Sequence, residues 1–181
     1  VVIPGANQYG NARAIQEALS GLSWALVVVT SDEERRYPID TLQHPNMRVW
    51  LQYPAKGDKA DWYLPVGYPP HYLQHLAGVP YGKPEGWFWS GQVNHTRRKE
   101  LAAVLRGMDG GEHIETPGFT QGLPHDAYAL RLARARFAPC PSGPESVDSF
   151  RVAEALEAWA LPILDTSTPH GDAAWLGPPG D

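Results

Sequence analysis

The most constraining feature of this sequence is an alternation of short apolar runs with segments of helical spacing. The run WALVVV, residues 24–29, is continuous and β-branched, as expected of a strand buried on both faces of a parallel sheet. Six further strand-like runs occupy residues 47–52, 60–66, 87–90, 113–115, 137–140 and 161–164. Helical spacing occurs over residues 11–19, 95–106, 124–135 and 148–159. Strands that alternate with helices predict an α/β fold with parallel sheets.

A stretch rich in proline and glycine divides this pattern into two halves. We interpret residues 69–86 as a hinge, with one helical turn around Tyr72–Leu76. Residues 1–68 then form a first Rossmann-like lobe and residues 87–181 a second, and 181 residues are enough for two small lobes. Because the first half has few helices, we expect its lobe to be short or incomplete.

Composition excludes several classes of protein. The formal net charge is -5 and no basic block occurs, so binding to nucleic acid through phosphate neutralisation is not expected. No apolar run approaches the roughly 18 residues of a membrane-spanning helix. The one cysteine, Cys140, excludes a disulfide framework and favours a reducing, cytoplasmic setting. We expect its thiol to be packed in the core rather than to act as a nucleophile.

The segment FAPCPSGPESVDSFRVAEALEAWALPIL, residues 137–164, reads as a strand, a loop, a helix and a second strand. In a parallel α/β sheet, ligands bind outside the carboxyl ends of the strands, where this loop is expected. The helix is expected to begin near Asp148, and a helix N-terminus favours a phosphate group. Ser146 and Ser149 add hydroxyl donors there.

Helical spacing also assigns faces to this helix. Val152, Leu156 and Trp159 are expected to form its buried stripe, which leaves Glu154 on the opposite side. A carboxylate at that place can accept two hydrogen bonds from a vicinal diol, such as a ribose. The alternative is that Asp148 caps the helix and Glu154 is a solvated surface residue, and spacing alone favours this alternative.

A second constellation lies in the segment WFWSGQVNHTRRKEL. A strand ends at Ser90 and Gly91, and a helix follows whose first turn contains Arg97 and Arg98. Cations are unfavourable at a helix N-terminus, and a bound diphosphate removes this conflict because arginine pairs with phosphate through two donors. The alternative is a pair of surface arginines with Glu100 as a partner.

Together, these two segments resemble the exostosin-like glycosyltransferases, which have the two-Rossmann-domain architecture called GT-B. CPSGPESVDSFRVAEALEAWALPIL is similar to the family's pattern of Cys-Pro, a polar loop, Ser-Phe-Arg, Glu-Ala-Leu and a final Pro-containing strand. FWSGQVNHTRRKEL is similar to its strand end followed by His-x-Arg-Arg-x-Glu-Leu. The resemblance covers residues 87–164 well, and it extends more loosely to residues 27–54 and 61–70.

The resemblance implies a glycosyltransferase that moves a sugar from a nucleotide-sugar donor, expected to be UDP-linked, to a glycan, protein or small-molecule acceptor. It implies that Glu154 binds the ribose and that Arg97 and Arg98 hold the diphosphate. The nucleotide-sugar-binding residues that it implies are Ser90, Gly91, His95, Arg97, Arg98, Ser149, Phe150, Arg151 and Glu154. It further implies that arginines and helix ends balance the leaving diphosphate, so that neither a metal site nor another cofactor is expected.

Two departures from the family's pattern keep other functions open. Trp159 and Ala160 stand where the family has a pair of small residues, and the first half is short for a GT-B domain. A non-catalytic GT-B-like module that binds a nucleotide, a glycan or a protein is therefore the main alternative. A small α/β hydrolase or phosphatase is a further alternative.

The segment TSDEERR, residues 30–36, follows the first buried strand and supplies candidate bases. A glycosyl transfer that inverts configuration needs a group that takes the proton of the acceptor hydroxyl. We take Asp32 as the candidate catalytic base. The alternative is an acidic loop that pairs with Arg35 and Arg36.

Overall fold

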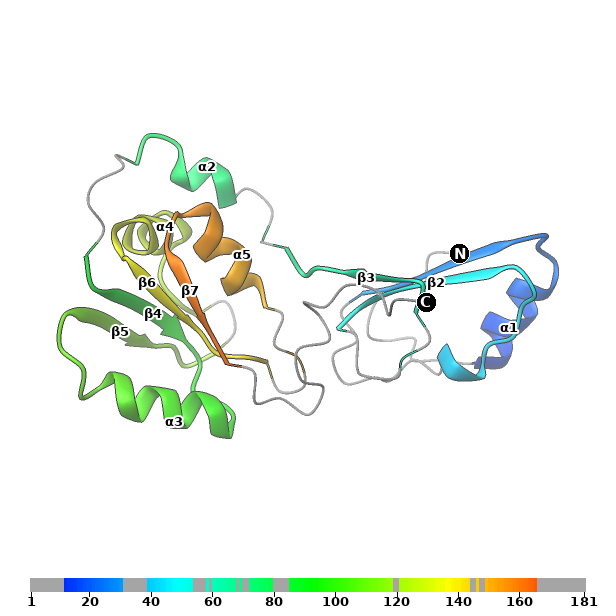
Figure 1. Cartoon of the computed structure of the whole chain (residues 1–181), viewed down its shortest axis with the longest axis horizontal. Helices are drawn as coiled ribbons and strands as arrows, with labels where there is room; N and C mark the ends of the chain where they lie inside the picture. Colours follow the sequence, from blue (N-terminus) through cyan, green and yellow to red (C-terminus); the bar gives the residue numbers. More distant parts are fainter. Residues whose placement is uncertain are drawn as a thin grey trace.

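The computed structural model describes residues 12–30, 39–53, 58, 60–67, 69, 72–79, 85–118, 121–143, 146 and 149–165. Within these ranges the chain is an α/β protein with two parallel sheets, which lie toward opposite ends of its long axis (Figure 1). The expected α/β class with parallel sheets is confirmed, and both sheets are compatible with Rossmann-like lobes.

The first sheet has three strands in the order β1-β2-β3. Its elements are α1 (Ala12–Ser20), β1 (Ala25–Val29), the 3-10 helix η1 (Ile39–Thr41), β2 (Met47–Gln52) and β3 (Trp62–Leu64). Val27 of β1 lies in register with Val49 of β2, and both are buried in one cluster with Leu19 of α1. The core of this lobe therefore lies between α1 and one face of the sheet.

The expectation that β1 is buried on both faces is wrong. Ala25, Val27 and Val29 are buried, whereas Val28 between them is 40% exposed. Successive side chains of a strand point to opposite faces of the sheet, and the buried cluster that includes α1 uses only one of these faces. A β-branched run therefore predicted the strand, but not the number of covered faces.

The second sheet has four parallel strands in the order β5-β4-β6-β7. Its elements are α2 (Tyr72–Leu76), β4 (Trp87–Gly91), α3 (Thr96–Leu105), β5 (Gly111–Glu115), α4 (His125–Arg134), β6 (Phe137–Cys140), α5 (Phe150–Glu157) and β7 (Leu161–Leu164). The chain passes from β4 to β5 on one side and then returns to β6 on the other side of β4. The strand order reverses between β4 and β6, which is where open α/β sheets bind their ligands.

Helices cover both faces of this second sheet (Figure 1). Helices α4 and α5 pack on one face, where Phe88, Leu132 and Val152 belong to one buried cluster. Helix α3 packs on the other face, where Trp89 and Leu105 belong to a second cluster. All five residues of β4 are buried, as expected of a central strand covered on both faces.

The helical turn expected within the hinge is α2, and it packs against α4 of the second lobe. Tyr72 of α2 is only 2% exposed, and its hydroxyl group donates a hydrogen bond of 3.2 Å to the backbone oxygen of Glu154. The ring of His75 stacks on that of His125 in α4, with 5.6 Å between centroids. This part of the expected hinge is therefore built into the second lobe.

The predicted buried stripe of α5 is largely wrong. Val152 is buried as expected, but Leu156 is 60% exposed and Trp159 is 72% exposed. The residue that joins Val152 against the sheet is Ala155, which is fully buried. A small side chain lets the helix lie close to the sheet, so α5 is rotated relative to the expectation, and Glu154 lies in a different environment.

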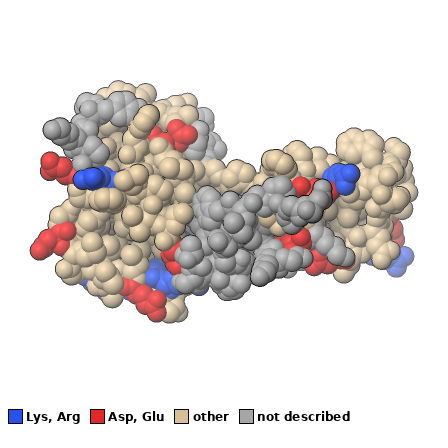
Figure 2. Space-filling view, in the orientation of Figure 1, with Lys and Arg blue, Asp and Glu red and all other residues tan. Residues whose placement is uncertain are grey.

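Two observations concern the membrane-spanning and nucleic-acid-binding classes that were considered from composition. In the described part of the chain, no helix is long and apolar enough to span a bilayer. On the face shown in Figure 2, the acidic and basic side chains of the described residues are scattered rather than gathered into a basic surface.

Candidate functional site

Several of the residues predicted from the sequence lie at the carboxyl ends of β4 and β6 or at the helix N-termini that follow them. Ser90 and Gly91 end β4, and both are buried. His95 is the N-cap residue of α3, which follows β4, and Ser149 is the N-cap residue of α5, which follows β6. In the described part of the chain, neither cap residue makes a side-chain capping hydrogen bond. The topology therefore brings two helix N-termini to the point where the strand order reverses.

Arg151 connects the first turn of α5 to the end of β4. Its Nη2 atom donates a hydrogen bond of 2.6 Å to the backbone oxygen of Ser90. Its guanidinium group also lies over the ring of Trp89, 5.9 Å from the centroid. A Cβ atom on Gly91 would lie 2.8 Å from the same Nη2 atom. Glycine at this position therefore allows the arginine to reach the strand.

Arg97 takes its partners from the loop after β6. Its Nε atom donates to Oγ of Ser142 at 2.8 Å, and its Nη2 atom donates to the backbone oxygen of Gly143 at 2.5 Å. The Ser142 hydroxyl in turn donates to Oδ2 of Asp165 at 2.9 Å, and Asp165 forms an ion pair with Arg97 at 3.6 Å. The charge of Arg97 is thus balanced within the chain, without the bound diphosphate that the sequence argument invoked.

Three polar atoms at the same edge of the sheet are buried and have no hydrogen-bond partner within the described ranges. They are Nε2 of His95, Oγ of Ser149 and Nε of Arg151. A buried polar group without a partner costs about 1–3 kcal/mol, so such groups are rare and mark sites that bind a ligand or water. All three belong to the set of site residues predicted from the sequence.

The electrostatic environment of His95 favours a neutral imidazole. Burial lowers the pKa of His95 below its usual value, and the nearby charges of Arg98 and Arg97 act in the same direction, whereas the charge of Asp165 and a hydrogen bond with the backbone of Ser142 partly oppose this shift. Arg98 itself lies half-buried in the first turn of α3. A neutral imidazole carries one N–H donor and one acceptor nitrogen, so it can contact either a phosphate oxygen or a hydroxyl group.

Glu154 does not face solvent as the spacing argument expected. Its Oε2 atom accepts a hydrogen bond of 2.8 Å from the hydroxyl group of Tyr128 in α4. Burial raises the pKa of Glu154, whereas the hydrogen bond from Tyr128 and the charges of Arg151 and His125 act in the opposite direction. The carboxyl group lies one turn beyond Arg151 on α5, on the side of the helix that faces α4.

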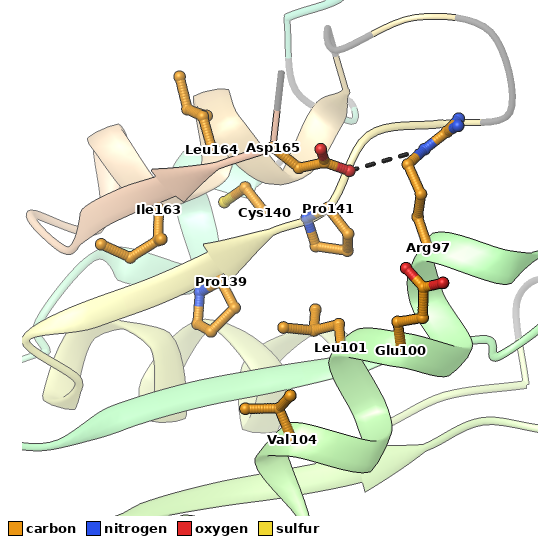
Figure 3. Close-up of a pocket in the computed structure, with 10 residues that line it drawn as sticks. All are labelled: Arg97, Glu100, Leu101, Val104, Pro139, Cys140, Pro141, Ile163, Leu164 and Asp165. Atoms are coloured by element: carbon orange, nitrogen blue, oxygen red, sulfur yellow. Dashed lines mark ion pairs between the residues drawn. The ribbon is translucent and has the colours of Figure 1, made fainter. Parts of the chain in front are cut away.

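A pocket of about 290 Å³ lies beside these residues, between α3 and the strands β6 and β7 (Figure 3). Most of its walls are apolar, and Arg97, Glu100 and Asp165 form the polar part of its lining. The complete lining is Arg97, Glu100, Leu101, Val104, Pro139, Cys140, Pro141, Ile163, Leu164 and Asp165. Of the predicted site residues, Arg97 lines this pocket, and Figure 3 shows its guanidinium group extending away from the apolar wall.

Three residues of the site were missed by sequence reasoning. Ser142 and Asp165 anchor Arg97, and Tyr128 binds Glu154. Ser142 lies in a loop that the sequence argument had already placed at the ligand edge. Tyr128 carried no signal, because a tyrosine within a predicted helix is ordinarily a packing residue.

The remaining candidates have different outcomes. Asp32, the candidate base, lies outside the described residues, as does the predicted cap Asp148. Phe150 begins α5 and is 42% exposed.

Cys140 is 1% exposed, and burial raises the pKa of its thiol to about 12, as expected of a core residue rather than a nucleophile. In the described ranges, no group of three or more His, Cys, Asp or Glu residues could hold a metal ion.

No model of a known protein family matches this chain, and no curated protein matches it either. The assignment to the exostosin-like family therefore stays a prediction that rests on the quoted residues.

Proposed function

We propose that this chain is a glycosyltransferase that binds a nucleotide-sugar donor, UDP-linked, at the carboxyl ends of β4 and β6. The observation that supports this proposal is the set of buried atoms without partners on His95, Ser149 and Arg151. They lie where two helix N-termini meet, and free backbone N–H groups there add positive potential that favours a phosphate. A diphosphate supplies the acceptor oxygens that the Ser149 hydroxyl group and the Nε–H group of Arg151 lack, and the unpaired Nε2 atom of His95 lies beside them.

The proposal gives each residue a role. His95, Ser149 and Arg151 bind the diphosphate, and Glu154 binds the ribose. Arg97 binds Ser142 and thereby holds in place the loop after β6, which borders the site. The arginines and helix ends stabilise the charge that develops on the leaving diphosphate, and the sugar passes to a glycan, protein or small-molecule acceptor. We also propose that the two lobes form a GT-B-type architecture and that the protein acts in the cytoplasm, without a metal ion.

A second candidate function is a non-catalytic GT-B-like module that binds a nucleotide or a glycan. It is favoured by the internal partners of two predicted site residues. Arg97 is balanced by Asp165, and Glu154 accepts a hydrogen bond from Tyr128. A site whose charges are satisfied within the chain can persist after catalysis has been lost.

The decisive experiment compares the wild type with Ser149→Ala in calorimetric titrations with UDP and UDP-sugars. We expect the wild type to bind and Ser149→Ala to bind about tenfold more weakly, since a hydrogen bond to a charged group contributes about 1.5 kcal/mol. The stability of the variant should not fall, because the hydroxyl group removed has no hydrogen-bond partner among the residues that the structure describes. Ser20→Ala, at an exposed serine of α1, is the matched control.

The outcomes separate the two candidate functions. Binding together with release of UDP from a UDP-sugar supports the transferase. Binding without turnover for any sugar donor supports the non-catalytic module. A wild type that binds neither UDP nor a UDP-sugar at millimolar concentration contradicts both.

A further inference from the structure

The side chain and the backbone of Glu154 are both held by tyrosines from other helices. Tyr128 of α4 donates to Oε2 of the carboxyl group at 2.8 Å, and Tyr72 of α2 donates to the backbone oxygen at 3.2 Å. Tyr128 is itself oriented by packing, since its ring lies 5.7 Å from that of Phe88 at an angle of 58°. Glu154 is therefore fixed at two atoms by residues far from it in the sequence.

One carboxyl oxygen of Glu154 is thus occupied and the other is available. The hydrogen bond from Tyr128 uses Oε2, and among the described residues Oε1 accepts no hydrogen bond. Arg151 lies one turn before Glu154 on the same helix and reaches Ser90 at the end of β4. In the proposed binding mode the phosphates contact Arg151, and the ribose contacts Glu154 one turn further along α5.

We propose that Tyr128 is a positioning residue for ribose recognition, because its hydroxyl group holds one carboxyl oxygen of Glu154 so that the carboxyl group faces the ribose diol of the donor. This inference rests on the proposed function, and it assigns a role to a residue outside the set predicted from the sequence. Tyr128 does not contact the donor; it acts through Glu154.

The hydrogen bond from Tyr128 also supports the charge of Glu154. The ionisable and charged groups around Glu154 are Arg151 and Glu157 on its own helix, Tyr128 and His125 on α4, Tyr72 on α2 and Cys140 on β6. Burial raises the pKa of Glu154, and the Tyr128 hydroxyl lowers it. A carboxylate accepts hydrogen bonds from both ribose hydroxyls, whereas a protonated carboxyl group has lost part of that capacity. Removing the Tyr128 hydroxyl therefore raises the pH below which ribose recognition fails.

The test is a titration of wild type and Tyr128→Phe with UDP and with 2′,3′-dideoxy-UDP between pH 5 and pH 8. We expect Tyr128→Phe to bind UDP about five- to tenfold more weakly at neutral pH, which corresponds to the loss of one hydrogen bond. Its affinity for the dideoxy compound, which has no diol, should not change. Its loss of UDP affinity on acidification should begin at a higher pH than in the wild type. Tyr63→Phe, at a half-buried tyrosine of β3, is the matched control.

A double variant tests whether Tyr128 acts through Glu154. In a Glu154→Gln background, Tyr128→Phe should cause no further loss of UDP affinity, because residues that act through one contact are not additive. Equal losses of UDP and dideoxy-UDP affinity in Tyr128→Phe indicate general damage to the site and overturn the inference, as does an unchanged pH profile. A wild type that binds UDP and its dideoxy analogue equally well overturns ribose recognition by Glu154 but leaves diphosphate binding in place. A wild type that binds neither overturns the proposed function itself.

Discussion

At the scale of single residues, the buried hydroxyl group of Ser142 connects three segments of the second lobe. It accepts a hydrogen bond from Arg97 at the start of α3 and donates one to Asp165 just after β7, while it lies itself in the loop after β6. Ser142 is fully buried, and the side chains of Arg97 and Asp165 are 21% and 27% exposed. The ion pair alone is 3.6 Å long, so the hydroxyl group lies closer to Arg97 and to Asp165 than these two residues lie to each other.

We therefore predict that Ser142→Ala lowers the free energy of unfolding by about 2 kcal/mol, because it leaves the partly buried Arg97 and Asp165 groups with fewer partners. Urea denaturation at neutral pH measures this change. Ser20→Ala in α1 removes one exposed hydrogen bond and should change the unfolding free energy by less than about 0.5 kcal/mol. A loss in Ser142→Ala no larger than in this control would show that the hydroxyl group is not a structural link.

At the scale of single elements, α5 ends in an unfavourable backbone conformation. Trp159 has a φ angle of 62°, in the left-handed region that side chains other than glycine disfavour. It lies just after the C-cap residue Ala158, at the position where helices commonly end with glycine. Because its side chain is 72% exposed, its packing offsets little of this strain.

We predict that Trp159→Gly raises the unfolding free energy by about 1 kcal/mol through relief of this strain. The melting temperature of the second lobe should then rise by about 4–8 °C, the shift expected for an unfolding unit of 60–100 residues. Thermal denaturation followed by circular dichroism measures the change. Trp24→Gly, at a 66% exposed tryptophan outside the left-handed region, is the control and should not stabilise the protein. An equal rise in both variants would mean that removal of an exposed indole, rather than backbone strain, is responsible.

The rotation of α5 also shows where inference from sequence stops at this scale. Spacing placed the helix correctly between β6 and β7 but assigned Leu156 and Trp159 to the core. The structure buries Ala155 instead, because a helix packed closely on a sheet needs a small residue at the contact. Hydrophobic periodicity cannot detect this preference, since alanine contributes little to an apolar stripe.

At the scale of the whole molecule, the two sheets have separate cores. The cluster in the first lobe contains Leu19, Val27 and Leu51, and the two clusters in the second lobe share no residue with it. Separate cores allow the two lobes to unfold separately, since few buried contacts couple them.

We accordingly predict two thermal transitions in differential scanning calorimetry. Leu51→Ala in β2 should lower the melting temperature of one transition, and Leu132→Ala in α4 that of the other. Each variant should lose the 2–5 kcal/mol of unfolding free energy that is typical of a buried leucine truncated to alanine. The two variants act as controls for each other. A single transition that both variants lower equally would show instead that the lobes unfold as one unit.

Most of the element order could be predicted from the sequence alone. Strands and helices are set by local periodicity and by the proline and glycine residues between them, so β2, β6 and β7 begin and end where the pattern placed them. The gathering of polar residues at one edge of the second sheet was also predictable, because parallel strands expose their carboxyl ends together and the polar residues follow β4 and β6.

Only the tertiary structure decided which of these polar residues meet. Arg97 and Ser142 are 45 positions apart in the sequence, and Tyr128 and Glu154 are 26 apart. Such pairs depend on the rotation of α5 and on the packing of α4 beside it, which no local pattern encodes. The sequence by itself determined the alternating strands, the helices and the polar edge, because these follow from neighbouring residues. The tertiary structure decided how the charges are satisfied and which buried polar atoms have no hydrogen-bond partner among the described residues, because these follow from contacts between distant segments.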